Sequence, residues 1–153
     1  MRMSFDSSAF LKLYVDEAGT AQMIHLIESA DESAISVLVF PEIVSGLSRK
    51  VREGTLLSAQ YRDTKRRLAD DVRDATIVHI SPSVISKSVA LLENNVLRAS
   101  DAIHVASALE CDADLFVSSD RRQIAAAANA GLPTRFIAPD GSEPNCWPSQ
   151  RVR

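Results

Sequence analysis

Four acidic residues stand out in this sequence because their positions would allow them to act together. Asp6 and Asp120 each come just after a short β-type run, and Asp101 lies in the first turn of a helical pattern. Glu42 is set in an apolar stretch, where a carboxylate is costly unless it is paired or liganded. Singly, each is also typical of a helix start, where backbone N–H groups and the helix dipole stabilise acids. The four together favour a shared carboxylate site.

Short β-type runs alternate with helical patterns, which is typical of a parallel sheet covered by helices. The strand candidates are residues 2–5, 33–36, 76–80, 115–118 and 135–137. The helical patterns cover residues 8–15, 21–27, 39–52, 59–72, 84–92, 102–109 and 124–130. We predict a three-layer α/β domain with a central parallel sheet of about five strands flanked by helices. Functional groups of such sheets gather beyond the carboxyl ends of the strands, where the strand order reverses.

Turn and cap residues mark several boundaries. Ser81 followed by Pro82 predicts a helix start, and Gly131 predicts a helix end. Gly54 separates two helical patterns and predicts a helical hairpin beside the sheet. Because residues beyond 138 are rich in Pro, Gly, Ser and Asn, we expect one domain over residues 1–138 and an irregular C-terminal tail over 139–153.

Four segments carry a resemblance to a known family. They are residues 5–14 (FDSSAFLKLY), 41–43 (PEI), 98–106 (RASDAIHVA) and 115–122 (LFVSSDRR). In order and spacing they resemble the acidic motifs of the PIN-domain nucleases, and among these the VapC-type toxins of bacterial and archaeal toxin-antitoxin modules. The resemblance spans residues 3–137 and makes residues 1–138 a PIN-like nuclease domain. One departure is Ser4-Phe5, where aliphatic residues are usual.

The resemblance implies that the four acids lie at the carboxyl edge of the sheet, bind Mg²⁺ or Mn²⁺ and support endonucleolytic cleavage of RNA. Hard divalent ions prefer oxygen ligands, so a few carboxylates and a substrate phosphate complete their shell. The ion then activates water and neutralises charge on the phosphate, and no protein nucleophile is needed. We expect Asp6 and Asp101 to be the principal ligands, Asp120 to bind directly or through water, and Glu42 to orient a metal-bound water.

Neighbouring polar residues have weaker claims to the site. Ser7 and Ser118 are expected to support the acids through their hydroxyls, as hydroxyls at similar positions do in the family. His104 lies one helical turn after Asp101 and is within reach of the acids. Because hard-metal sites favour oxygen and no partner of His104 is evident, we leave it outside the predicted site.

The charge of the chain limits how it binds nucleic acid. A net charge of −3 excludes binding by bulk electrostatics, so any contact with phosphates must be local. Arg49 lies two helical turns after Glu42, and two further arginines adjoin Asp120. The expected RNA-binding residues are Arg49, Arg52, Arg121 and Arg122. We expect a second basic cluster to lie on the outer helical hairpin instead, formed by Arg62, Lys65, Arg66 and Arg67.

Composition places the chain among cytoplasmic globular proteins. Charged residues make up 24% of the sequence, no apolar run is long enough to cross a bilayer, and the first residues do not resemble a signal peptide. Cys111 and Cys146 have no metal-ligand spacing and are expected to be reduced thiols.

The family resemblance also implies a homodimer and a complex with a cognate antitoxin protein. The sequence offers one candidate apolar stripe for the dimer, which is equally consistent with core packing. Its residues are Leu11, Tyr14, Val15, Met23, Ile24 and Ile27.

Other functions remain open from the sequence. A phosphorelay receiver is disfavoured because Ser7 and Ser8 follow Asp6 where paired acids are needed, and a phosphatase of the Asp-x-Asp type because Ser8 takes the place of the second aspartate. A PIN-type nuclease acting on single-stranded or branched DNA is the alternative enzyme. A module that binds metal or nucleic acid without cleaving is the alternative outside catalysis.

Overall fold

The computed structural model of the chain describes residues 1–138, so the expected tail of residues 139–153 lies outside the described residues. Its centre is a five-stranded sheet in the order β3-β2-β1-β4-β5, with every neighbouring pair parallel. The strands are β1 (Arg2–Phe5), β2 (Glu32–Ser36), β3 (Thr76–Val78), β4 (Leu115–Ser118) and β5 (Thr134–Phe136). Because β2 and β3 lie on one side of β1 and β4 and β5 on the other, the strand order reverses between β1 and β4.

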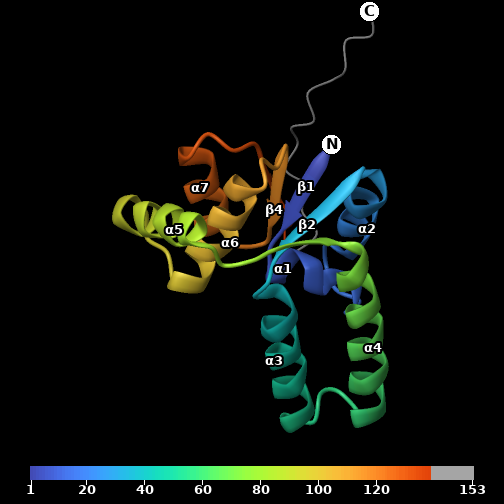
Figure 1. Cartoon of the computed structure of the whole chain (residues 1–153). Coiled ribbons are helices and arrows are strands. Elements are labelled where there is room, and N and C mark those ends of the chain that lie inside the picture. The colour runs from blue at the N-terminus through green and yellow to red at the C-terminus, as the bar shows by residue number, and fades with distance from the viewer. Residues whose placement is uncertain (139–153) are drawn as a thin grey trace, which may run out of the picture.

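Helices connect these strands. They are α1 (Ser7–Phe10), the 3₁₀ turn η1 (Leu11–Leu13), α2 (Thr20–Ser29), α3 (Val39–Arg52), α4 (Ser58–Asp74), α5 (Pro82–Asn94), α6 (Ala99–Glu110) and α7 (Arg121–Asn129). They cover the sheet on two sides, and the α3–α4 hairpin extends beyond its end (Figure 1). The predicted three-layer α/β fold is confirmed.

The single helix expected over residues 8–15 is wrong. The chain forms α1 and then tightens into η1, which ends with Tyr14 N–H donating to the Leu11 carbonyl. Lys12 is the physical reason, because its side chain is buried and its ammonium donates to Glu17 Oε1 and to the Ala18 carbonyl, both at 2.9 Å. These two bonds hold the turn against the loop that follows it.

Two hydrophobic clusters lie on the two sides of the sheet. One is formed with α1 to α4, and the other with α5 to α7. Successive side chains of β4 point to opposite faces of the sheet, so Phe116 packs in the second cluster and Val117 in the first. The apolar stripe considered for a dimer belongs almost entirely to the first cluster: Met23 is fully buried there and only Ile24 is substantially exposed.

The marked helix ends are confirmed. Ser81 Oγ accepts a bond from Val84 N at 3.2 Å, with Pro82 at the first helical position. Gly131 has a φ of +83°, and Leu132 N–H returns to the Ala127 carbonyl at 3.0 Å, as at a glycine C-terminus. No helix in residues 1–138 has the length and apolar character needed to cross a membrane.

Candidate active site

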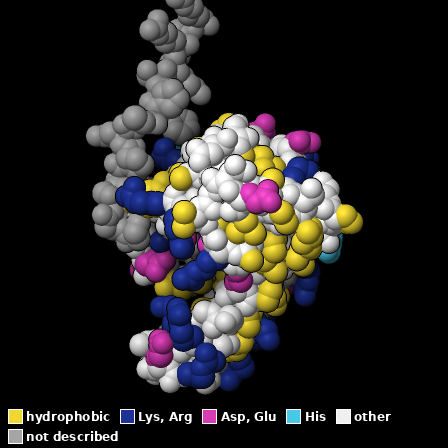
Figure 2. Space-filling model, turned by 90° about the vertical axis from the view of Figure 1, so that its left-hand side faces the viewer, with side chains coloured by type: hydrophobic (Ala, Val, Ile, Leu, Met, Phe, Trp, Pro, Cys, Tyr) yellow, Lys and Arg dark blue, Asp and Glu magenta, His cyan; other side chains and the backbone are white. Residues whose placement is uncertain are grey.

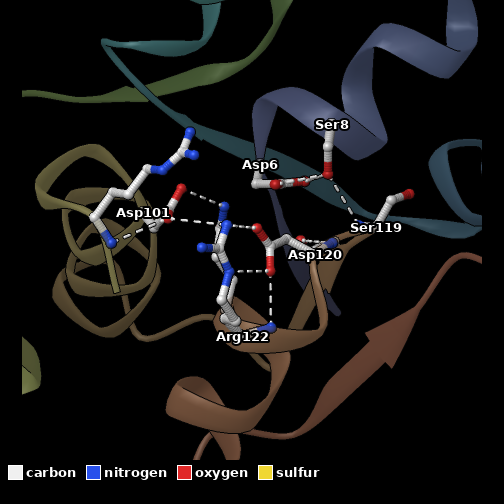
Figure 3. A network of polar contacts seen from close by, with 9 residues as sticks. Asp6, Ser8, Asp101, Ser119, Asp120 and Arg122 are labelled. Carbon is white, nitrogen blue, oxygen red and sulfur yellow. Dashed lines mark hydrogen bonds and ion pairs between the residues drawn. The ribbon is translucent and has the colours of Figure 1, made fainter. Parts of the chain in front are cut away.

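Asp6 lies where β1 meets β4, at the switch point of the sheet. Its backbone N–H donates to the Val117 carbonyl of β4 at 3.1 Å, and its carboxylate caps α1 by accepting from Ala9 N at 2.9 Å. Ser8 Oγ donates to both carboxylate oxygens, at 2.9 and 2.8 Å, and accepts from Ser119 N at 3.0 Å (Figure 3). These bonds hold Asp6 against the end of β4.

Asp6 is 1% exposed, and this burial raises the pKa of its carboxyl above the ordinary value. The Ala9 N–H, the nearby His104 and the hydroxyls of Ser8 and Ser118 oppose that shift. A buried carboxylate of this kind is stabilised in its charged form by a cation close to it.

Asp101 and Asp120 meet at one guanidinium. Arg122 Nη2 lies 2.8 Å from Asp120 Oδ2 and 3.8 Å from Asp101 Oδ2, and Figure 3 shows its head group between the two acids. The Arg122 side chain and backbone N–H hold the pKa of Asp120 below its ordinary value. Asp101 also accepts from Arg98 N and from Gln123 Nε2, each at 3.2 Å.

Glu42, in the first turn of α3, is tied to two other segments. Its Oε2 accepts from Ser7 Oγ at 2.5 Å and lies 2.8 Å from His104 Nε2. The hydrogen bond with His104 is the largest cause of a lowered Glu42 pKa, ahead of the bond from Ser7. Glu42 therefore releases its proton more readily than an ordinary glutamic acid.

The structure brings both predicted serines to the acids. Ser7 reaches Glu42 as described. Ser118 Oγ opposes the rise in the pKa of Asp6 and accepts from Asp120 N at 2.9 Å. Three further contacts were missed from the sequence, those of Ser8, Gln123 and His104. Gln123 could be interpreted as a capping-box partner of Asp120, but its amide bonds Asp101. Leaving His104 outside the site overlooked its direct contact with Glu42.

The four predicted RNA-binding arginines lie in different environments. Arg49 is 68% exposed and 3.9 Å from Glu53, and Arg52 is exposed at the end of α3. The Arg121 guanidinium lies over the Phe136 ring, 4.4 Å from its centroid. Arg122, expected on a phosphate, contacts two acids of the site.

The acids do not form a finished ligand set. Within residues 1–138, no group of three or more Asp, Glu, His or Cys side chains is arranged to hold a metal ion. Asp101 and Asp120 share Arg122, Asp6 reaches the same edge through Ser8 and Ser119, and Glu42 is held on α3. The chemistry of the donors still fits a hard divalent cation, because they are carboxylate oxygens and a cationic guanidinium already lies between two of them.

A parallel α/β domain with carboxylates at the switch point of its sheet defines the class of this protein. The family model of the PIN domain matches residues 3–129. Ribonuclease VapC45 of Mycobacterium tuberculosis (strain CDC 1551 / Oshkosh) is 31% identical over 127 residues, covering 82% of this chain and 88% of the relative. The chain belongs to the PIN domain family, as a VapC-type member.

Solved structures agree with this fold. A toxin-antitoxin complex from Klebsiella pneumoniae matches with a TM-score of 0.62 and 20% identity, over 80% of this chain and 90% of the other. VapC20 of Mycobacterium tuberculosis, described as a sarcin-ricin loop cleaving toxin, matches with a TM-score of 0.64 and 15% identity. The match covers 85% of this chain and 95% of VapC20.

Proposed function

We propose that this protein is a metal-dependent endoribonuclease that cleaves RNA phosphodiesters in the cytoplasm, and that it is the toxin of a toxin-antitoxin pair. The observation that carries this proposal is the gathering of acids from separate segments at the switch point of a PIN-domain sheet. The ribonuclease name of a relative that is 31% identical gives the substrate class.

Each acid and serine of the site has a role that follows from its contacts. Asp6, Asp101 and Asp120 would hold Mg²⁺ or Mn²⁺, which when bound activates water and neutralises the phosphate. Ser8 and the Ala9 N–H hold the Asp6 carboxylate at the end of β1, and Ser118 fixes the backbone that carries Asp120. Ser7 holds the carboxylate of Glu42, which would orient the attacking water.

Arginines would position the RNA around this acidic edge. Arg49 lies on α3 two turns beyond Glu42, and Arg52 ends the same helix. Figure 2 shows Lys and Arg side chains gathered on the lower part of the molecule, which the α3–α4 hairpin forms. Arg121 and Arg122 directly follow Asp120 at the start of α7. Phosphate contacts of this kind fix the register of a strand without selecting its sequence.

The protein partner is a cognate antitoxin that covers the acidic edge. The fold similarity to a protein solved within a toxin-antitoxin complex supports this partner. An antitoxin bound there would block both the acids and the arginines that position RNA.

A second copy of the chain would pack on α5. Ile85, Val89 and Leu92 are 45, 47 and 38% exposed, at a spacing of four and then three residues on one side of the helix. Figure 2 faces the side of the molecule on which α5 lies and shows hydrophobic side chains grouped there. That spacing is typical of a seam between two helices, and a two-fold axis lets the same face meet itself.

Cleavage of matched substrates tests the function. The purified protein is incubated with end-labelled RNA and with DNA of the same sequence, in Mg²⁺, in Mn²⁺ and in EDTA. We expect internal cuts in the RNA only, and only with a divalent ion. Cuts confined to DNA would identify the DNA-specific alternative, and Mn²⁺ binding without any product would identify a non-catalytic module.

A further inference from the structure

His104 is a buried imidazole whose place in the core is not explained by packing. It is 2% exposed, on a helix whose other inward residues, such as Ala102 and Val105, pack in the second hydrophobic cluster. A polar ring at such a position is costly unless it is hydrogen-bonded. The Glu42 carboxylate supplies that bond, from a residue 62 positions earlier in the chain.

The partners of the ring assign its tautomer. Nε2 lies 2.8 Å from Glu42 Oε2, and an ionised carboxylate only accepts hydrogen bonds, so Nε2 carries the hydrogen. Nδ1 is buried and has no hydrogen-bond partner in the described part of the chain. The tautomer with its hydrogen on Nε2 therefore satisfies the contact and leaves no buried N–H group without an acceptor.

Two donors meet on a single oxygen of Glu42. Ser7 Oγ, from α1, and His104 Nε2, from α6, both contact Oε2, and they lie 3.3 Å from each other. Glu42 itself stands on α3, which packs mainly against α1 and α4. The bond to His104, together with a hydrogen bond from Ser100 at the start of the same helix, thus ties the Glu42 side chain to α6.

We propose that His104 is a positioning residue, which through its Nε2–H holds the Glu42 carboxylate in place to orient the attacking water. It does not touch substrate or metal. This inference rests on the proposed function, since it gives Glu42 its orientation in RNA cleavage.

The test is a double-mutant cycle on cleavage. His104→Leu removes the donor and is expected to lower kcat about 10- to 100-fold, the usual effect of losing a group that orients a catalytic residue. The KM for RNA stays unchanged, because no phosphate contact is lost. When Glu42→Gln is already present, adding His104→Leu should change kcat by less than about twofold, since the residue acts through Glu42. His104→Gln keeps a donor near the position of Nε2 and should restore most of kcat.

Ser107→Ala is the matched control. Ser107 is 1% exposed on the same helix, and its hydroxyl has no hydrogen-bond partner within residues 1–138. We expect this variant to cleave RNA like the wild type. Thermal melting of every variant confirms that it is folded. Long-range ¹⁵N spectra of the wild type, without RNA, should show the Nε2–H tautomer of His104.

The outcomes separate the two proposals. A wild-type protein without metal-dependent cleavage overturns the proposed function. If the wild type is active, two results overturn the positioning role alone. One is a folded His104→Leu variant that keeps the full kcat. The other is a His104→Leu change that lowers kcat by the same factor in the wild type and in the Glu42→Gln background. If His104→Leu does not fold, two other results overturn the positioning role. These are a loss of activity in a folded His104→Gln variant and an Nδ1–H tautomer of His104 in the wild type.

Discussion

Two glycines of the α3–α4 hairpin form a matched pair for testing how the backbone is built. Gly46 lies inside α3, and Gly54 lies two residues past its end with a φ of +73°. A Cβ added at either position meets no atom within 4 Å. The same substitution to alanine therefore encounters open space at both sites, and the two variants differ only in the backbone conformation required.

The expected changes in the free energy of unfolding have opposite signs. Gly46→Ala replaces a poor helix former in a helix interior and should stabilise the protein by about 0.5–1 kcal/mol. Gly54→Ala forces a Cβ into the left-handed region and should destabilise it by about 1–2 kcal/mol. The two variants should then differ by about 1.5–3 kcal/mol, which for a domain of this size separates their Tm values by roughly 3–12 °C.

Urea unfolding followed by circular dichroism gives both values. The wild type and the two variants are compared in one buffer, and the slope of free energy against urea should be the same for all three. If Gly46→Ala lowers the unfolding midpoint, the side of α3 beside Gly46 is not open and this reasoning is refuted. A Gly54→Ala variant as stable as the wild type would show that the turn does not need its positive φ.

Three other predictions address the site and the assembly. Because the pKa of Glu42 is lowered in the folded protein, Glu42 stabilises the fold above its unfolded pKa of about 4.3, and this contribution is lost as the pH falls through the folded value. Glu42→Gln should therefore make the free energy of unfolding depend less steeply on pH in acid. An unchanged pH dependence argues against the bond with His104. Arg49→Ala should reduce the slope of log affinity for single-stranded RNA against log salt concentration by about 0.7, and Arg66→Ala on α4 should leave this slope unchanged. The reverse result would show that the RNA binds along α4. Ile85→Ser with Val89→Ser should convert a dimer to a monomer in light scattering, and a monomeric wild type contradicts the dimer.

Local patterns predicted most of the fold. The bounds of β1, β4 and α3 agree with the sequence prediction residue for residue, because apolar runs and helical periodicity are properties of neighbouring residues. The strand predicted over residues 76–80 ends at Val78. Lys12 is a further exception, since nothing local reveals that a lysine turns inward to bind the next loop.

The site was predictable only in part. The positions of Asp6 and Asp120 follow from strand ends that share one edge of a parallel sheet. The contacts between Glu42 and His104 and between Gln123 and Asp101 join residues 62 and 22 positions apart. Such contacts depend on how helices pack, which the spacing along the chain does not encode.

The central claim is that carboxylates at the switch point cleave RNA with a divalent ion. The most direct measurement compares the RNA cleavage rates of Asp101→Asn and Asp63→Asn in Mn²⁺. Asp101 is 9% exposed at the site, and the Asp63 side chain is 72% exposed on α4, so each change removes one charge in a different place. We expect Asp101→Asn to lose about 100-fold or more of the rate, the scale of losing one electrostatic group from an active site, and Asp63→Asn to match the wild type. Equal rates for the folded Asp101→Asn variant and the wild type would contradict the account.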